Sequence, residues 1–134
     1  MKKEKKDKKE KKPKQKKAQE PAAEEENKEF ANFVKCDFRV GRITDCWVHP
    51  ESDKLYCEKI DIGEGESRQI GSGLQLDVPL ADMTGLVVVF ANLKPKKLGG
   101  YDSHGMVMCG HPDDKRSFII RPHPESKVGE RIQI

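Results

Sequence analysis

The sequence predicts an all-β domain, a small closed or partly closed barrel of five or six short strands. Runs rich in β-branched and aromatic residues alternate with turn residues from residue 38 onward. The first run is long and is interrupted by Gly41, which predicts a bulge or a sharp bend at that point. Between the strands, one short stretch suits a single helical turn. An open sandwich of two sheets is the alternative architecture.

Residues 1–29 differ from the rest of the chain in composition. Residues 1–17 contain eleven lysines against three acidic residues, and residues 18–29 contain five glutamates against one lysine. Apolar side chains are almost absent, so this stretch cannot bury enough surface to offset the loss of chain entropy. We expect a disordered tail over residues 1–29, Lys-rich and then Glu-rich, before a domain over residues 30–134. Such a tail either binds a polyanion through charge alone or only solubilises or targets the protein.

The first elements of the domain follow from local patterns. A short helix is expected over residues 27–34, because Phe30, Phe33 and Val34 fall on one helical face. The first strand is expected over residues 38–48 and ends before Pro50, since proline removes a hydrogen-bond donor from a strand. In the second strand, apolar residues occur at both parities, which predicts a bend or burial on both sides. That strand is expected over residues 55–62.

The second half of the domain contains shorter candidate elements. A turn with two glycines leads to a third strand over residues 67–71, and residues 78–83 suit one helical turn. The fourth strand, residues 86–91, is the most apolar run of the chain. The last strands are expected at residues 106–109, at residues 118–120 and, on an edge, at residues 131–134.

Residues 92–108 follow the most apolar strand and are the most informative stretch of the sequence. Lys94, Lys96 and Lys97 stand at its head, and Pro95 stiffens the backbone between them. Cationic side chains held at the rim of a small β-domain suit the phosphate groups of a nucleic acid. The pattern therefore favours a non-catalytic, nucleic-acid-binding module over an enzyme. An ordinary solvated loop is the alternative for these lysines.

Metal, catalytic and membrane functions find little support in the residues. The four cysteines form no C-x-x-C pair and the four histidines add no spaced ligands, so we expect no metal and no cofactor. Ser103 and His104 are adjacent and project differently, so they make no nucleophile–base pair. No apolar run reaches the roughly 20 residues of a membrane span. Dispersed thiols without a secretory signal are typical of a reduced, cytoplasmic protein.

Four motifs occur in a fixed order along the domain, at residues 37–41, 49–56, 72–74, and 92–97 together with 103–108. In this order they resemble the tRNA-binding OB-fold domain. That domain occurs at the C-terminus of many methionyl-tRNA synthetases, in free-standing tRNA-binding proteins and in cofactors similar to endothelial-monocyte-activating polypeptide. The resemblance covers about residues 30–134. It implies a five-stranded OB-fold barrel that binds the outer corner of folded tRNA with little sequence discrimination, which suits the hidden base edges of double-helical RNA.

The lysines and arginines are the expected phosphate contacts. Lys94, Lys96 and Lys97 are the main ones. Arg39 and Arg42 flank the glycine of the first strand, and a guanidinium suits a phosphate. A salt bridge with a neighbouring aspartate, at position 37 or 45, is the alternative for both arginines.

The remaining candidates are polar or apolar. Lys54 and Asn92 would each add one contact, and a role in a turn is the alternative for both. The resemblance implies that Ser103 donates a hydrogen bond to a phosphate or ribose and that Met106 contacts a base or sugar. From the residue pattern alone, Met106 would belong to the core. His104, together with Tyr101, is a candidate for stacking on a base.

The resemblance also implies the partners. It favours tRNA as ligand and an aminoacyl-tRNA synthetase, methionyl-tRNA synthetase first, as the protein that the domain is appended to or supplies with tRNA. The end of the chain resembles the short form of the family, which is generally a homodimer. The alternative is a protein-binding module, either a chaperone-like one or a scaffold in a synthetase complex, because some relatives with this fold bind peptides.

Overall fold

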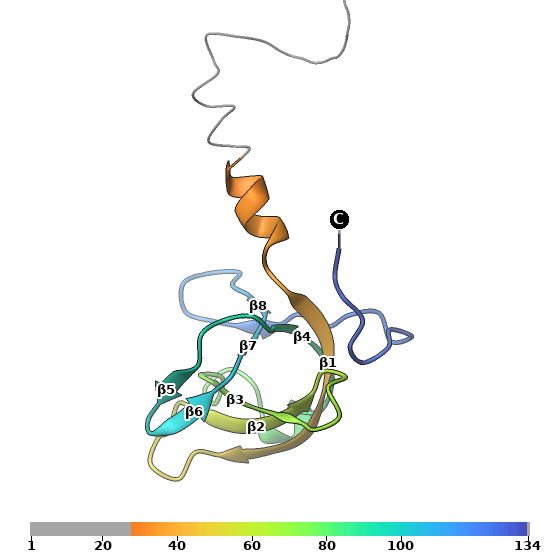
Figure 1. Ribbon diagram of the computed structural model, residues 1–134. Helices are drawn as coiled ribbons and strands as arrows, with labels where there is room; N and C mark the ends of the chain where they lie inside the picture. Colours follow the sequence, from red (N-terminus) through yellow and green to blue (C-terminus); the bar gives the residue numbers. More distant parts are fainter. Residues whose placement is uncertain (1–27, 134) are drawn as a thin grey trace, which may run out of the picture. The chain divides into compact units, whose positions relative to one another are not determined.

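The computed structural model describes residues 28–133, and the chain divides into two compact units with the boundary after Lys35 (Figure 1). In the first unit a helix spans residues 28–34, as the sequence predicts, and its Phe30, Phe33 and Val34 are exposed. The tail expected over residues 1–29 lies outside the described residues, apart from its last two, which begin this helix. No helix within the described range is long and apolar enough to cross a bilayer.

The second unit is built almost entirely of strands. Seven of the nine strands described in it and its 3₁₀ turn lie within one or two residues of predicted elements, although the single strand expected over residues 106–109 is divided into two, β7 and β8. The hairpin of β5 and β6 is additional. The elements are β1 (Phe38–Val48), β2 (Tyr56–Asp61), β3 (Arg68–Ser72), η1 (Leu80–Asp82), β4 (Gly85–Phe90), β5 (Lys96–Leu98), β6 (Tyr101–Ser103), β7 (Met106–Val107), β8 (Cys109–Gly110) and β9 (Phe118–Ile119).

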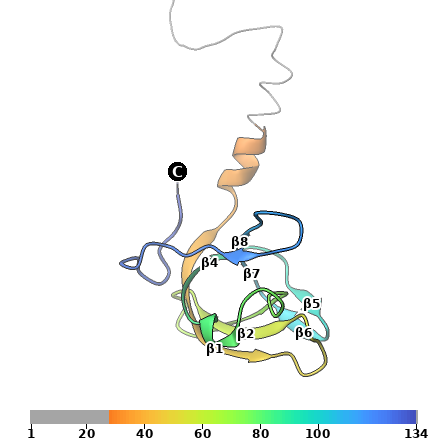
Figure 2. The ribbon, with the colours of Figure 1, turned by 180° about the vertical axis from the view of Figure 1, so that it is seen from behind.

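Five strands form one antiparallel sheet in the order β3-β2-β1-β4-β7, which curves round into a barrel (Figures 1 and 2). The long β1 pairs with β2 through one half and with β4 through the other. β3 and the segment between β6 and β7 then approach each other, and the His104 N–H donates to the Gln69 carbonyl at 2.8 Å. The barrel is therefore nearly closed, which confirms the predicted five-stranded barrel and leaves the sandwich without support.

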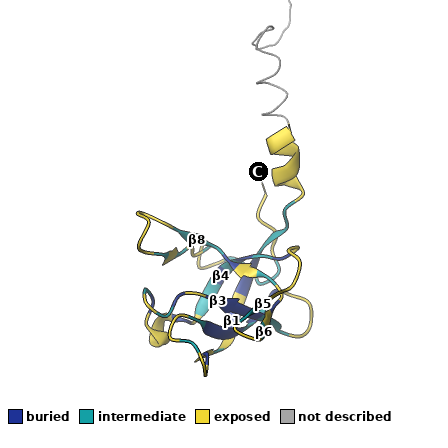
Figure 3. Cartoon of the chain, turned by 90° about the vertical axis from the view of Figure 1, so that its left-hand side faces the viewer, coloured by how far each residue is buried: buried dark blue, intermediate teal, exposed yellow. Residues whose placement is uncertain are grey.

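The core lies inside the barrel. Ile60, Ile62, Ile70, Val87 and Val89 are completely buried, and Figure 3 shows the buried residues gathered in the strands. Burial of these aliphatic side chains is the main term that stabilises the barrel.

β2 is buried on both of its faces, as the mixed parity of its apolar residues suggested. Tyr56 and Ile60 face the interior, while Cys57, of opposite parity, is also buried. The β5–β6 hairpin covers this outer face: a Cβ atom on Gly71, which pairs with Cys57, would lie 3.1 Å from Leu98 Cδ1. The strand is thus enclosed between the core and the hairpin.

The bulge expected at Gly41 lies elsewhere. The register of β1 against β2 shifts between Ile43 and Asp45, three residues further along. Gly41 has a packing role instead, because a Cβ there would come within 2.8 Å of Ile60 Cγ2 and 3.2 Å of Val89 Cγ2. A side chain at this position would press against three core residues, since Ile62 Cγ2 would also lie 3.1 Å away.

The C-terminal segment extends the sheet, as expected of an edge strand, but only briefly. Arg131 forms a single antiparallel bridge with Arg39. The Val40 N–H donates to the Glu130 carbonyl at 2.9 Å and the Ile132 N–H to the Phe38 carbonyl at 2.8 Å. This segment satisfies the half of β1 that β2 does not reach.

Candidate nucleic-acid interface

The lysine hairpin, residues 92–103, packs over the outer face of the barrel next to Gly71 of β3. β5 and β6 lie side by side in both views and are joined by Gly99 and Gly100 with φ of 58° and 84°, the values of a two-residue type I′ turn (Figures 1 and 2). The buried His49 holds this turn. Its Nδ1 accepts the N–H of Glu51 at 3.0 Å, so Nε2 carries the proton and donates to the Gly99 carbonyl at 2.9 Å.

The three lysines of the hairpin are exposed but differ in their partners. Lys97 Nζ lies 2.8 Å from Asp102 Oδ1 on the opposite strand. The hydrogen bond from Lys97 holds the pKa of the Asp102 carboxyl below its ordinary value. Lys94 and Lys96 have no ion pair with any residue of the described chain. They are the cations most available to a phosphate.

Lys54 belongs to a loop that lies against the turn of the hairpin. A Cβ atom on Gly99 would lie 3.1 Å from His49 Nε2 and 3.4 Å from Leu55 Cδ1, which places the loop 49–55 next to that turn. Lys54 itself is exposed, and its backbone N–H donates to Ser52 Oγ at 3.1 Å. The structure therefore brings this lysine close to the lysine hairpin.

Ser103 is placed differently from what the resemblance implies. Its side chain is only 4% exposed, its Oγ accepts the N–H of Gly71 at 2.9 Å, and its hydroxyl donates to the Gly105 carbonyl at 2.9 Å. The hydroxyl proton is therefore already used within the fold. In this geometry Ser103 anchors the turn to β3.

His104 and Met106 present their side chains to solvent. The backbone of His104 is engaged on both sides, by Gln69 and by Arg68, while its imidazole is exposed. Met106 is 51% exposed, so it is not the core residue that the pattern alone suggested. It pairs with Phe90 of β4, and the ring centroid of Phe90 lies 4.7 Å from that of Phe38 in β1. Met106 thus extends a row of apolar side chains across β1, β4 and β7.

Arg39 forms the salt bridge that was the alternative to phosphate binding. Its Nε lies 3.0 Å from Asp37 Oδ1, and this hydrogen bond holds the pKa of the Asp37 carboxyl below its ordinary value. Arg131 Nε lies 3.8 Å from the same oxygen. Two guanidinium groups share one carboxylate, so this end of β1 keeps a net positive charge. Asn92 contacts the same aspartate through the backbone, because its Oδ1 accepts the Asp37 N–H at 2.9 Å.

Arg42 lies apart from the other candidates. It is exposed and pairs with Leu86 on one side and Asp61 on the other. It is three residues along β1 from Arg39, a distance of roughly 10 Å at the rise of a strand. None of the other candidates is among its strand partners.

Sequence reasoning missed three side chains that organise the interface, namely His49, Arg68 and Arg131. The histidine was part of a motif, but nothing marked its contact with Gly99. Tyr101, a stacking candidate, is also structural: its hydroxyl donates to the Glu58 carbonyl at 3.2 Å, and its ring meets Trp47 edge-on with centroids 6.1 Å apart. These contacts join residues far apart in the chain, which a local pattern does not reveal.

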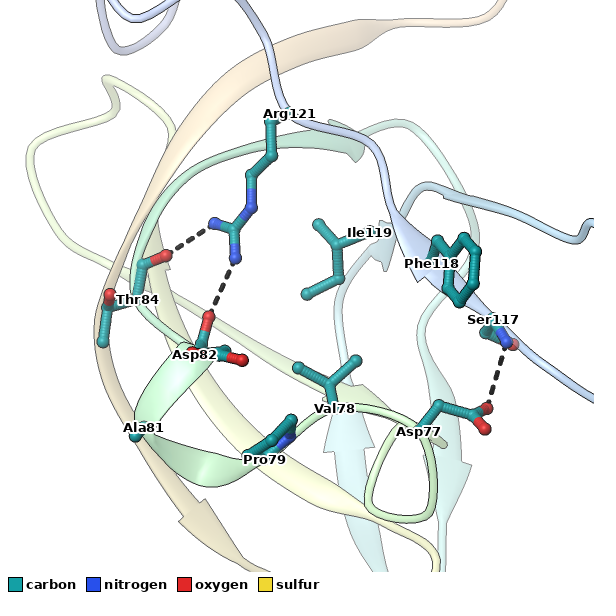
Figure 4. A pocket seen from close by; sticks show the side chains of 10 residues that line it. All are labelled: Asp77, Val78, Pro79, Ala81, Asp82, Thr84, Ser117, Phe118, Ile119 and Arg121. Atoms are coloured by element: carbon teal, nitrogen blue, oxygen red, sulfur yellow. Dashed lines mark hydrogen bonds between the residues drawn. The ribbon is translucent and has the colours of Figure 1, made fainter.

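The barrel also has a pocket of about 420 Å³ between the η1 region and β9, drawn in Figure 4. Arg121 points across it, and its guanidinium donates to the carbonyls of Thr84 at 2.6 Å and Asp82 at 2.8 Å. None of the ten expected RNA contacts lines this pocket. The lining residues are Asp77, Val78, Pro79, Ala81, Asp82, Thr84, Ser117, Phe118, Ile119 and Arg121.

Metal-binding chemistry is not seen among residues 28–133, where no three His, Cys, Asp or Glu side chains gather as a possible metal site. Cys36, Cys46, Cys57 and Cys109 are free. Burial raises the pKa of the Cys46 thiol to about 12, which makes it a poor nucleophile.

The sequence matches one family model over residues 38–131, a family described as "Putative tRNA binding domain". The cytoplasmic methionine–tRNA ligase of Caenorhabditis elegans is 46% identical over 99 residues, which are 73% of this chain and 11% of that ligase. The chain thus spans only about a tenth of the length of this relative.

Two solved structures are similar to the whole barrel. The MetRS related protein from Pyrococcus horikoshii matches with a TM-score of 0.73 and 28% identity, over 78% of this chain and 95% of that chain. The chaperone CsaA from Bacillus anthracis matches with a TM-score of 0.69 and 26% identity, over 78% of this chain and 96% of that chain.

Proposed function

Because this chain belongs to the family of putative tRNA-binding domains, we propose that it binds the outer corner of folded tRNA and supplies tRNA to an aminoacyl-tRNA synthetase. Residues 38–131 are a tRNA-binding domain related to domains of aminoacyl-tRNA ligases. The single observation that carries the proposed mode of binding is the lysine hairpin, which holds exposed cations on a paired strand that leads into the exposed Met106 turn.

The geometry suits a ligand recognised by shape and charge. Lys94, Lys96 and Lys54 would contact phosphates, and Met106 with His104 would meet an exposed base or sugar. The arginine pair around Asp37 adds positive potential at the end of β1. Since most of these contacts would be made to the backbone, recognition in this proposal depends on the spacing of phosphates in the folded RNA.

The proposed partner is a synthetase, with methionyl-tRNA synthetase favoured because methionine–tRNA ligases are among the relatives. The domain has no catalytic role in this proposal: it raises the local concentration of tRNA near an active site on another domain or protein. We also propose that the chain acts in the cytoplasm and that it forms a homodimer.

Binding of tRNA by the full-length chain tests the proposal. We expect filter binding at low salt to show higher affinity for folded tRNA than for a single-stranded RNA of equal length and charge. The logarithm of the affinity should fall linearly with the logarithm of the salt concentration. Equal affinity for the two RNAs would leave only the charge of the tail and would contradict structure-specific binding.

A second candidate function is peptide binding, which the similarity to the CsaA chaperone favours. Exposed apolar side chains such as Phe118 and Ile120 would supply the contacts. This function predicts that the chain delays the aggregation of an unfolded protein and that the effect is insensitive to salt. Loss of that effect in 0.5 M salt, together with preference for tRNA, would exclude it.

A further inference from the structure

One seam of the barrel is closed mainly by side chains. Across it, the described chain has a single backbone hydrogen bond, from His104 to Gln69. Side chains make further bonds across it, including those from Gln69 Nε2 to the Asp102 carbonyl at 2.8 Å and from the Gly71 N–H to Ser103 Oγ at 2.9 Å. The seam therefore lacks the regular ladder that holds the other strands together.

Arg68, at the start of β3, spans the end of this seam. Its Nη1 donates to the Ala91 carbonyl and, at 2.9 Å, to the His104 carbonyl. Its Nη2 and Nε donate to the Glu64 carboxylate at 2.6 and 3.3 Å. The guanidinium is thus held by acceptors from three segments, and the side chain is only 21% exposed.

The two carbonyls that Arg68 joins stand at the bases of both parts of the candidate interface. Ala91 is the residue before the lysine hairpin, and His104 begins the turn that presents Met106. The two N–H groups of Nη1 are both used by these carbonyls. The residue is therefore placed to fix the separation of the two segments, and its bound geometry turns those donors inward, away from a ligand.

We propose that Arg68 is a positioning residue of the tRNA interface, which sets the distance between the lysine hairpin and the His104–Met106 turn. The inference rests on the proposed tRNA binding. Its chemistry requires the planar fork of a guanidinium, because Arg68 reaches four acceptor oxygens with three nitrogens, whereas a lysine ammonium offers three N–H groups from one nitrogen. Charge alone is not what Arg68 contributes.

Arg121 offers a matched control. It also clamps backbone carbonyls, those of Asp82, Thr84 and Leu86, but it lies beside the pocket of Figure 4, away from the lysine hairpin. Arg121→Lys should therefore lower stability in the same way as Arg68→Lys without touching the interface. Both variants keep the net charge of the chain.

We expect Arg68→Lys, in the full-length chain, to bind tRNA about 10-fold more weakly than the wild type, while Arg121→Lys binds with wild-type affinity. Arg68→Gln should weaken binding similarly with an unchanged salt slope. A slope reduced by about 0.9 in Arg68→Gln would mean that Arg68 neutralises a phosphate itself, and would overturn the proposal. Wild-type affinity in Arg68→Lys, or an equal loss in Arg121→Lys, would overturn it as well.

Amide hydrogen exchange of the RNA-free chain separates this inference from the proposed function. In Arg68→Lys, exchange should become faster in residues 91–98 and 103–107 and stay unchanged around η1. In Arg121→Lys the pattern should be reversed. If the wild type fails to prefer folded tRNA, the proposed function fails, while this exchange pattern still decides whether Arg68 holds the two segments. A wild-type pattern in Arg68→Lys would show that it does not.

Discussion

The lysine hairpin and the interior of the barrel use ionisable side chains in opposite ways. Lys94 and Lys96 are exposed and stay free to meet a phosphate. Glu58 is completely buried, its Oε1 accepts a hydrogen bond from Ser72 at 2.9 Å, and its Oε2 has no partner in the described chain. Burial raises the pKa of Glu58 to about 8, against the smaller opposing effect of the serine. The comparison teaches that solvent, and not the presence of an ionisable residue, decides which groups act on a partner.

The largest expected effect concerns the interior. Because the pKa of Glu58 is raised on folding, its contribution favours the folded state below the unfolded pKa of about 4.5 and is lost as pH rises towards 8. Each pH unit in this window costs about 1.4 kcal/mol of unfolding free energy. Glu58→Gln should remove this slope and be more stable than the wild type at pH 8, as measured by urea unfolding at several pH values.

Glu51→Gln is the control for that measurement, because Glu51 is exposed. It should keep the wild-type dependence of unfolding free energy on pH. If Glu58→Gln kept the same slope, the carboxyl would already be ionised in the folded barrel, and the contrast with the lysine hairpin would fail.

The next effect concerns the junction of the two regions, at Ser103. Ser103→Ala leaves the N–H of Gly71 without its acceptor in a buried position, which should lower the unfolding free energy by about 2 kcal/mol. Affinity for tRNA should fall without a change in salt slope. Ser67→Ala removes an exposed hydroxyl that meets Thr44 at 2.9 Å and should cost less than about 0.5 kcal/mol. Equal stabilities of the two variants would contradict the anchoring role.

The third prediction concerns the exposed lysines of the hairpin, Lys94 and Lys96. Lys94→Ala/Lys96→Ala should weaken tRNA binding about 10-fold at low salt, lower the salt slope by about 1 to 2 and leave stability unchanged. The matched double variant Lys115→Ala/Lys127→Ala removes two exposed lysines from other loops. Filter binding should show a clearly smaller loss for it, and an equal loss would mean that only net charge matters.

The smallest effect is expected at the pair of Lys97 and Asp102. Asp102→Asn releases the ammonium from a carboxylate 2.8 Å away and removes a negative charge, so tRNA affinity should rise about 2-fold. Lys97→Ala should weaken binding less than Lys96→Ala, because its charge is already compensated. If filter binding showed a larger loss for Lys97→Ala than for Lys96→Ala, the ion pair with Asp102 would not prevent Lys97 from binding the RNA.

Much of the fold was predictable because strands are indicated by local patterns of apolar and turn residues. β1 begins and ends at the predicted residues, and the interpretation of β2 as buried on both faces is confirmed. The β5–β6 hairpin was not predicted as strands, since its strands are only three residues long and offer no apolar alternation. The bulge was predicted at the wrong residue, because the glycine at position 41 makes room for Ile60 and Val89. Only the closed barrel brings these two side chains against it.

The candidate site was predictable in part. The sequence alone marked the lysines of the hairpin, since clustered cations beside a strand are visible in the primary structure. It could not show that Lys97 has an ion pair while Lys94 and Lys96 have none in the described chain. Nor could it show that the Ser103 hydroxyl is hydrogen-bonded to Gly105 and Gly71. The role of these ten residues as tRNA contacts stays a prediction, for which the variants above are the test.

By itself, the sequence determined the all-β class, the positions of most strands along the chain and the cluster of positive charge, because alternation and motifs depend on neighbouring residues. Only the tertiary structure decided which polar groups are hydrogen-bonded within the fold and which remain available to a ligand. The physical reason is that burial and hydrogen bonding depend on partners distant in the chain. Ser103 meets Gly71 across 32 positions, and Arg68 meets His104 across 36.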